Sequence, residues 1–326
     1  MTETEGGAAQ RWMRRADAAQ RRRPSLAFPF AVVKKFGDDR GGQMAALIAY
    51  YGFFSLFPLL LVFVTVAAFV IQDDESLRRQ LLDTVLGKFP VVGPSVRANI
   101  GSITGSPVVL AIGLVLALWS GTRVVTSIQW ALDDVWDVPR ADRPSLPTRV
   151  LRALLLLIVF GGAIVASTIL TAIDGGVLLE AASLLGTVAL SACMFAFAYR
   201  VLTVARISWR DVAPGAIVAA CAWTLMLMLG TWIVDRYVSQ AKAIYGVFAI
   251  VIGLLAWIAL FAQLFLLAAE VNVVRARRLW PRSLTEPANA PPDRAVLADQ
   301  AREERAAPEE RVDVRFEGRS EESVDR

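Results

Sequence analysis

Residues 243–269 read AIYGVFAIVIGLLAWIALFAQLFLLAA and contain no charged side chain. A helix that crosses a bilayer needs about 20 mostly apolar residues, because the hydrocarbon layer is roughly 30 Å thick and each helical residue rises about 1.5 Å. This stretch of 27 residues is long enough to span a membrane. Its near-continuous apolar character contradicts the alternating polarity of a transmembrane β-strand.

Five other stretches of the chain are equally apolar and free of charge. They lie at 44–71, 105–122, 153–173, 181–199 and 212–234. The whole chain of 326 residues is 56% hydrophobic and only 20% charged, which exceeds the apolar content of an ordinary soluble domain. The sequence therefore predicts an all-α fold, a polytopic membrane bundle with six transmembrane helices.

The basic residues between these spans predict the orientation of the bundle. With the N-terminus inside, the cytoplasmic connectors and the N-terminal leader carry 21 Lys and Arg, and the outside connectors carry 6. Cytoplasmic loops retain positive charge. We therefore expect both termini in the cytoplasm and a multi-pass protein of the bacterial cytoplasmic (inner) membrane.

The chain divides into three parts by composition. Residues 1–43 form a basic cytoplasmic leader, residues 44–282 form the transmembrane domain, and residues 283–326 form a charged cytoplasmic tail. The tail holds 7 Arg against 12 Asp and Glu and few large apolar groups, so we expect it to be disordered.

The long connector after the first span has apolar residues at helical spacing over 77–89, which predicts an amphipathic helix that lies on the membrane or caps the bundle.

The residue types present exclude most catalytic chemistry. The chain has no His, so it lacks an imidazole base or metal ligand, and its two cysteines both lie in apolar stretches. It shows no phosphate-binding glycine loop, no cysteine-pair metal pattern and no nucleophile arrangement. We expect no enzyme activity, no catalytic, cofactor-binding or metal-binding residues, no cofactor and no nucleic-acid partner.

Polar groups at membrane depth are costly and mark candidate functional positions. Arg123 ends the second span one turn after Trp119, and either extends to the lipid head groups or binds an anion or lipid phosphate. Glu270 and Asn272 close the sixth span at the same level. Glu270 could pair with Arg123; the alternatives are a structural bridge, plain exposure to solvent, or a part in a transport route.

The first span carries a second group of candidates. Tyr50, Tyr51 and Ser55 are its polar side chains, and Pro58 should kink the helix because proline has no N–H for the backbone hydrogen bond. A kink can expose a carbonyl to a solute, although proline kinks also occur in ordinary bundles. The carboxylates in WALDDVWDV at 130–138 are expected to be solvated loop residues.

Four blocks of this sequence resemble the YihY/BrkB family of bacterial membrane proteins. They are AYYGFFSLFPLLL at 49–61, SIQWALDDVWDV at 127–138, ISWRDVAPGAIVAACAW at 207–223 and IYGVFAIVIGLLAWIALFAQLFLLAAEVN at 244–272. The likeness runs from about residue 30 to 282. The resemblance implies a membrane protein of six spans without an established molecular activity. Proteins of this family have also carried the label ribonuclease BN. The label finds no support in a chain without His or a cluster of metal ligands.

Two functions remain open from the sequence. A transporter or channel-like protein of the cell envelope would arrange the seven candidate residues Tyr50, Tyr51, Ser55, Pro58, Arg123, Glu270 and Asn272 around an internal route for a small solute, ion or lipid. A non-catalytic membrane scaffold or assembly partner would use the same residues for helix pairing only. In both cases the lipid bilayer is the principal partner.

Overall fold

The structure, a computed structural model, describes residues 23–70, 107–171, 176–205, 207–233, 247–283 and 290–316, together with Asp17. These residues form eight α-helices and one short 3₁₀ turn, and no strand occurs among them. The helices are α2 (Pro24–Asp38), α3 (Gly41–Val70), α6 (Pro107–Val135), α7 (Leu146–Thr171), α8 (Gly176–Leu202), α9 (Trp209–Ile233), α11 (Val247–Arg277) and α12 (Pro291–Glu303), and η2 (Arg140–Asp142) follows α6.

The six long helices coincide with the six predicted apolar stretches. Five of them, α3, α6, α8, α9 and α11, contain a segment long and apolar enough to cross a membrane, and α7 contains the uncharged stretch 153–171. The prediction of a helical membrane bundle is confirmed, while the number of spans and their limits stay predictions. The predicted amphipathic helix at 77–89 lies outside the described residues.

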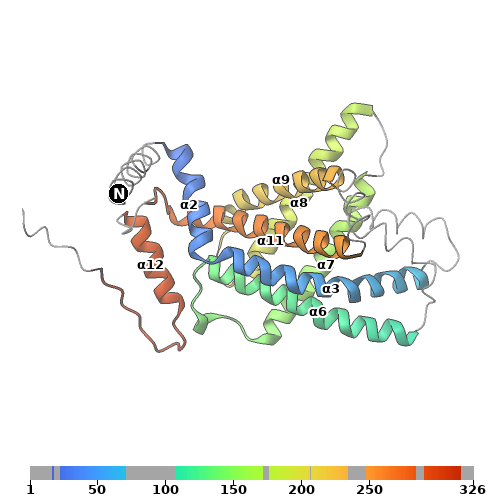
Figure 1. Cartoon of the computed structure of the whole chain (residues 1–326), viewed down its shortest axis with the longest axis horizontal. Coiled ribbons are helices and arrows are strands. Elements are labelled where there is room, and N and C mark those ends of the chain that lie inside the picture. The colour runs from blue at the N-terminus through green and yellow to red at the C-terminus, as the bar shows by residue number, and fades with distance from the viewer. Residues whose placement is uncertain are drawn as a thin grey trace, which may run out of the picture.

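Helices α2 and α12, from opposite ends of the chain, lie together at one end of the bundle (Figure 1). The Lys34 ammonium of α2 pairs with Asp293 of α12 at 3.1 Å. The connectors 136–145 and 203–208 meet at the same end, since the Val204 N–H donates to Asp133 and the Ala141 N–H donates to the Arg305 carbonyl. We call this the terminal end. The described parts of the segments predicted to be cytoplasmic gather there (Figure 1).

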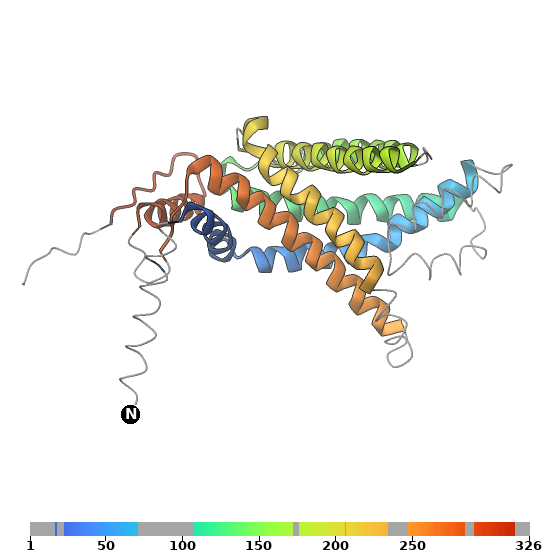
Figure 2. The same cartoon turned by 90° about the horizontal axis from the view of Figure 1, so that it is seen from above.

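A glycine allows a close approach of two helices in the bundle. Helices α9 and α11 run side by side and cross the direction of α6 and α8 obliquely (Figure 2). A Cβ atom on Gly215 of α9 would lie 2.1 Å from the carbonyl oxygen of Ala268 on α11, so only glycine allows this contact. The Gly215 N–H also donates to the Asn272 Oδ1 at 2.6 Å, which ties the two helices together.

The structure differs from the sequence prediction in the tail. Residues 283–326 were expected to be disordered, but Pro291–Glu303 form α12, in which Asp293 and Val296 are buried. Composition alone missed this helix because charge pairs with the rest of the chain, as well as apolar burial, hold it in place.

Part of the predicted leader is also folded. Helix α2 begins with Pro24 at its first turn, a favoured position for proline. Ala27, Ala31 and Lys35 recur every four residues and are all buried, so one face of α2 lies against the bundle. This face contacts α11, and it brings the Lys35 side chain into the interior of the terminal end.

Candidate functional site

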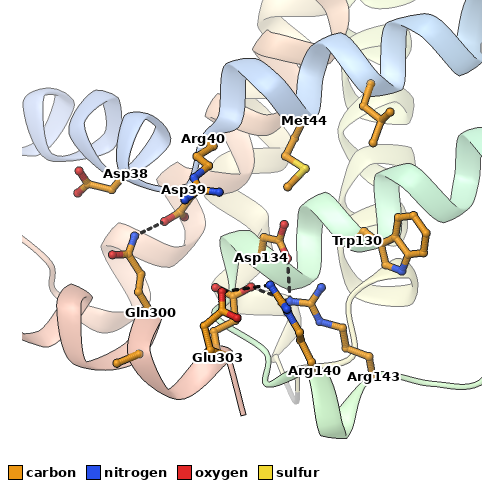
Figure 3. A pocket seen from close by; sticks show the side chains of 13 residues that line it. Asp38, Asp39, Arg40, Met44, Trp130, Asp134, Arg140, Arg143, Gln300 and Glu303 are labelled. Atoms are coloured by element: carbon orange, nitrogen blue, oxygen red, sulfur yellow. Dashed lines mark hydrogen bonds and ion pairs between the residues drawn. The ribbon is translucent and has the colours of Figure 1, made fainter. Parts of the chain in front are cut away.

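The terminal end contains a charged pocket of about 570 Å³ (Figure 3). The junction of α2 and α3, the last turns of α6, the η2 turn and α12 form its walls. Thirteen residues line it: Asp38, Asp39, Arg40, Met44, Leu47, Trp130, Asp134, Arg140, Arg143, Gln300, Ala301, Glu303 and Glu304. Both signs of charge are present, and Met44, Leu47 and Trp130 add an apolar side.

Helix α12 closes one wall of this pocket through charged contacts. Arg143 pairs with Asp134 and with Glu303 of α12, both at 2.7 Å, and the three side chains point toward one another (Figure 3). The Gln300 amide, also on α12, donates to Asp39 at the end of α2 at 3.3 Å. Burial and the adjacent Asp134 carboxyl raise the pKa of Glu303 to about 8. The pocket therefore exists in this form only while α12 is docked.

A fully buried lysine lies behind the pocket wall. The Lys35 ammonium donates to Asp39, to the Asp137 carboxylate at 3.3 Å and to the Val135 carbonyl at 3.3 Å. Burial by itself lowers the pKa of Lys35, but the surrounding carboxyl groups outweigh this effect and raise it above its ordinary value. Lys35 is therefore charged, and it joins α2 to the end of α6.

Glu270 of α11 is a neighbour of this lysine. Its side chain is fully buried, and within the described part of the chain neither carboxyl oxygen receives a hydrogen bond from a donor group. The carboxyl groups of Asp39 and Glu270 lie within hydrogen-bonding reach of each other. Since Asp39 also lines the pocket, a short polar connection links the pocket to a membrane helix.

Asp137 completes the buried cluster. It accepts hydrogen bonds from Lys35 and from Arg277, the latter at 2.6 Å, and its side chain is 2% exposed. Burial raises its pKa to about 6, although Lys35 and Arg277 oppose the rise. Arg277 also bonds Asp299 of α12 at 2.9 Å, so the cluster is continuous with the docked helix.

Asp293 anchors the start of α12. Its carboxylate accepts bonds from Arg282 at 2.6 Å, from the Ser283 N–H at 2.9 Å and from Lys34 at 3.1 Å. Burial alone would raise the pKa of Asp293, but these donors lower it to about 2. The ionised Asp293 carboxylate therefore stabilises the docking of α12 on the bundle.

The candidates on the first span lie elsewhere. Tyr50 is 55% exposed and its ring contacts Tyr51, with 5.5 Å between the centroids. Ser55 donates to the Gly52 carbonyl of its own helix at 2.9 Å, and Pro58 lies within α3. None of these four residues lines the charged pocket.

Arg123 and Glu270, for which the sequence leaves a pairing open, do not meet in the described structure. Arg123 is exposed and lies over the Trp119 ring, 5.8 Å from its centroid, as the spacing of the two residues predicts. Glu270 is buried beside Lys35 and Asp39 instead. Asn272, the neighbour of Glu270 in sequence, bridges α9 and α11.

The sequence interpretation missed the residues that surround Glu270. Asp133 and Asp137 were expected to be solvated, but both are buried, because α6 continues beyond Arg123 to Val135 and carries Asp133 inward, while Asp137 follows directly after the helix. The signal was present in the apolar neighbours of WALDDVWDV at helical spacing. The four-residue spacing of Ala27, Ala31 and Lys35 was the corresponding signal in α2.

The residues of this site suit ion pairing and proton binding. Within the part of the chain that the structure describes, no group of three or more His, Cys, Asp or Glu side chains is arranged to hold a metal ion. Carboxyl groups that contact one another can instead share a proton.

Comparison with known proteins assigns the chain to a family. It is 27% identical over 275 residues to YfkH of Bacillus subtilis (strain 168), a protein whose provisional name is ribonuclease-like. The aligned residues cover 78% of this chain and 96% of YfkH. It is 28% identical over 278 residues to the UPF0761 membrane protein Smlt0865 of Stenotrophomonas maltophilia (strain K279a), covering 80% of this chain and 63% of that protein.

The inner membrane protein YhjD of Escherichia coli (strain K12) is 26% identical over 161 residues, which cover 47% of this chain and 48% of YhjD. The matched region is thus about half of YhjD and somewhat under two thirds of Smlt0865. No solved structure is a significant match. The family model described as virulence factor BrkB matches residues 32–293, which is most of the chain. The chain therefore belongs to this BrkB family of membrane proteins.

Proposed function

We propose that this protein is a membrane transport protein that exchanges its substrate with the cytoplasm at the terminal end. The observation that carries the proposal is Glu270, a fully buried carboxyl group on a membrane helix that no donor among the described residues satisfies. An ionisable group at this depth is expensive to keep, and in membrane proteins such groups mark ion and substrate routes.

The position of Glu270 supports the same proposal. It lies behind Asp39, which lines a pocket large enough for a small solute. The pocket offers carboxylate and guanidinium groups beside an apolar side formed by α3 and α6. Such a lining suits a small polar or zwitterionic molecule.

Flux through proteoliposomes tests the proposal. The purified protein is reconstituted and the uptake of a panel of labelled ions, amino acids and lipid head-group analogues is measured. Glu270→Gln keeps the shape of the side chain and should reduce the flux of the transported solute by about tenfold or more. Glu309→Gln is the matched control, because Glu309 is exposed and does not line the pocket. Flux equal to that of empty vesicles for every solute contradicts the proposal.

A second candidate function is that of a membrane scaffold. It is favoured by the scattered positions of Tyr50, Ser55, Pro58 and Arg123, which do not assemble around the pocket, and by the ion pairs that already neutralise many of the pocket charges. A scaffold would retain its cellular phenotype in the Glu270→Gln variant provided that the variant folds and inserts. Degradation of RNA by the purified protein would instead favour the ribonuclease-like name of YfkH.

A further inference from the structure

The buried cluster behind the pocket contains more carboxyl groups than cations. Its members are Asp39, Asp137, Glu270, Lys35 and Arg277. The three acidic side chains and Lys35 are at most 2% exposed, whereas Arg277 is 30% exposed and shares its charge with Asp299. Even when the whole positive charge of Arg277 is assigned to the cluster, three carboxylates face two cations, and one negative charge remains unbalanced. An unbalanced charge in a dry interior is costly.

The available donors cannot satisfy Glu270. A lysine ammonium has three N–H donors, and those of Lys35 are directed to Asp39, Asp137 and the Val135 carbonyl. Among the described residues no other donor reaches a Glu270 oxygen. Glu270 is therefore buried and has no donor among the described residues, and the Asp39 carboxyl is its neighbour.

A proton resolves both problems together. Two ionised carboxylates only accept hydrogen bonds, so the contact between Asp39 and Glu270 would be repulsive. When one proton is bound, one carboxyl group becomes a donor to the other and the excess charge disappears. Burial also raises the pKa of Asp39, although the Lys35 ammonium opposes the rise.

We propose that Asp39 and Glu270 form a single proton-binding site, with one proton shared between their carboxyl groups. The proton arrives as hydronium from the pocket, which Asp39 lines; an O–H bond forms at a carboxylate oxygen as the O–H bond of hydronium breaks and water is released. The role of this site rests on the proposed transport function: the bound proton is the coupling ion of transport. The charged and polar groups that face it are Lys35 from α2, Asp137 from the end of α6, Arg277 from α11, and Asp299 and Gln300 from α12.

Infrared spectroscopy of the full-length protein in lipid nanodiscs tests the site without any assay of transport. A carboxylic acid group absorbs apart from carboxylates, and its band shifts in heavy water. The measurement is made on the Glu303→Gln protein at about pH 7.5, because Glu303 itself holds a proton near that pH and Asp137 does not.

The expected spectrum contains one acid band that disappears with either Asp39→Asn or Glu270→Gln. Either change leaves two carboxylates with two cations, so the remaining group no longer needs the proton. Glu304→Gln should leave the band unchanged, since Glu304 lies at the exposed rim. Absence of the band in the Glu303→Gln protein, or its survival in either single variant, overturns the proposal. If one of the two variants does not fold, the other decides the question.

The infrared result and the flux result fail independently. An intact acid band in a protein that moves no solute removes the transport function and leaves the proton site. Flux that is independent of a proton gradient, in a protein without the acid band, removes the proton site and leaves transport.

Discussion

At the scale of single residues, Gly215 makes the sharpest packing prediction. A Cβ atom there would lie 2.1 Å from the Ala268 carbonyl oxygen, a backbone atom that cannot rotate away. Gly215→Ala should push α9 from α11 and lower the free energy of unfolding by about 1–3 kcal/mol, the usual cost of overpacking. Unfolding in mixed detergent micelles measures it.

The control for this prediction is Gly121→Ala on α6. A Cβ atom on Gly121 meets no other atom within 4 Å. Alanine in a helix is more favourable than glycine by about 0.5–1 kcal/mol, so this variant should be as stable as the parent or more stable. Equal stability of the two alanine variants would mean that α9 and α11 are not in contact at Gly215.

Asp293 makes the second prediction at this scale. Asp293→Asn removes the charge that receives Arg282 and Lys34, and breaking a buried pair of this kind costs about 3–5 kcal/mol. Amide hydrogen exchange over 291–303 should therefore become fast. Asp313→Asn, in an exposed pair with Arg315, should leave exchange there unchanged. Slow exchange in the Asp293→Asn protein would show that the ion pairs do not hold α12.

At the scale of elements, α12 should respond to pH in a defined direction. The pKa of Glu303 is raised to about 8 from 4.5, so the docked helix binds a proton more tightly than the released one. The stability from this group is complete below pH 4.5 and is lost as the pH rises through about 8. Asp293, with a pKa of about 2, would loosen the helix only in strong acid.

Hydrogen exchange over 291–303, corrected for the intrinsic effect of pH, measures this response. We expect faster exchange at about pH 9 than at about pH 6. The Glu303→Gln variant resembles the protonated side chain and should exchange slowly at both values. The groups that face Glu303 are Arg143, Asp134 and Asp137, and they are unchanged in this variant. A parent protein whose exchange over 291–303 is the same at both pH values contradicts the prediction.

The elements also show how far sequence reasoning reaches. Long uncharged stretches predicted the six helices, because a membrane span depends on local composition. The site depended on contacts between distant segments, such as Lys35 with Asp137 and Arg143 with Glu303. Neither charge counts nor composition specify such contacts, so Glu270 was predicted as a candidate while the residues around it were not.

At the scale of the whole molecule, α2 and α12, from the two ends of the chain, meet beside the charged pocket (Figure 1). Asp38 of α2 and Asp293 of α12 both pair with Arg282, which follows α11. The excess of basic residues in the connectors at this end predicts that it faces the cytoplasm. The pocket and the tail would then share one compartment.

Labelling of Ala301→Cys with a membrane-impermeant maleimide tests the central claim most directly. Ala301 lines the pocket, and the native Cys193 and Cys221 are replaced by Ala beforehand. The account predicts labelling in inverted membrane vesicles and none in intact spheroplasts, with the same result for a cysteine at the exposed Ser25 of α2. Labelling of either position in intact spheroplasts, or of the two positions from opposite sides, would contradict a bundle whose two ends form one cytoplasmic site.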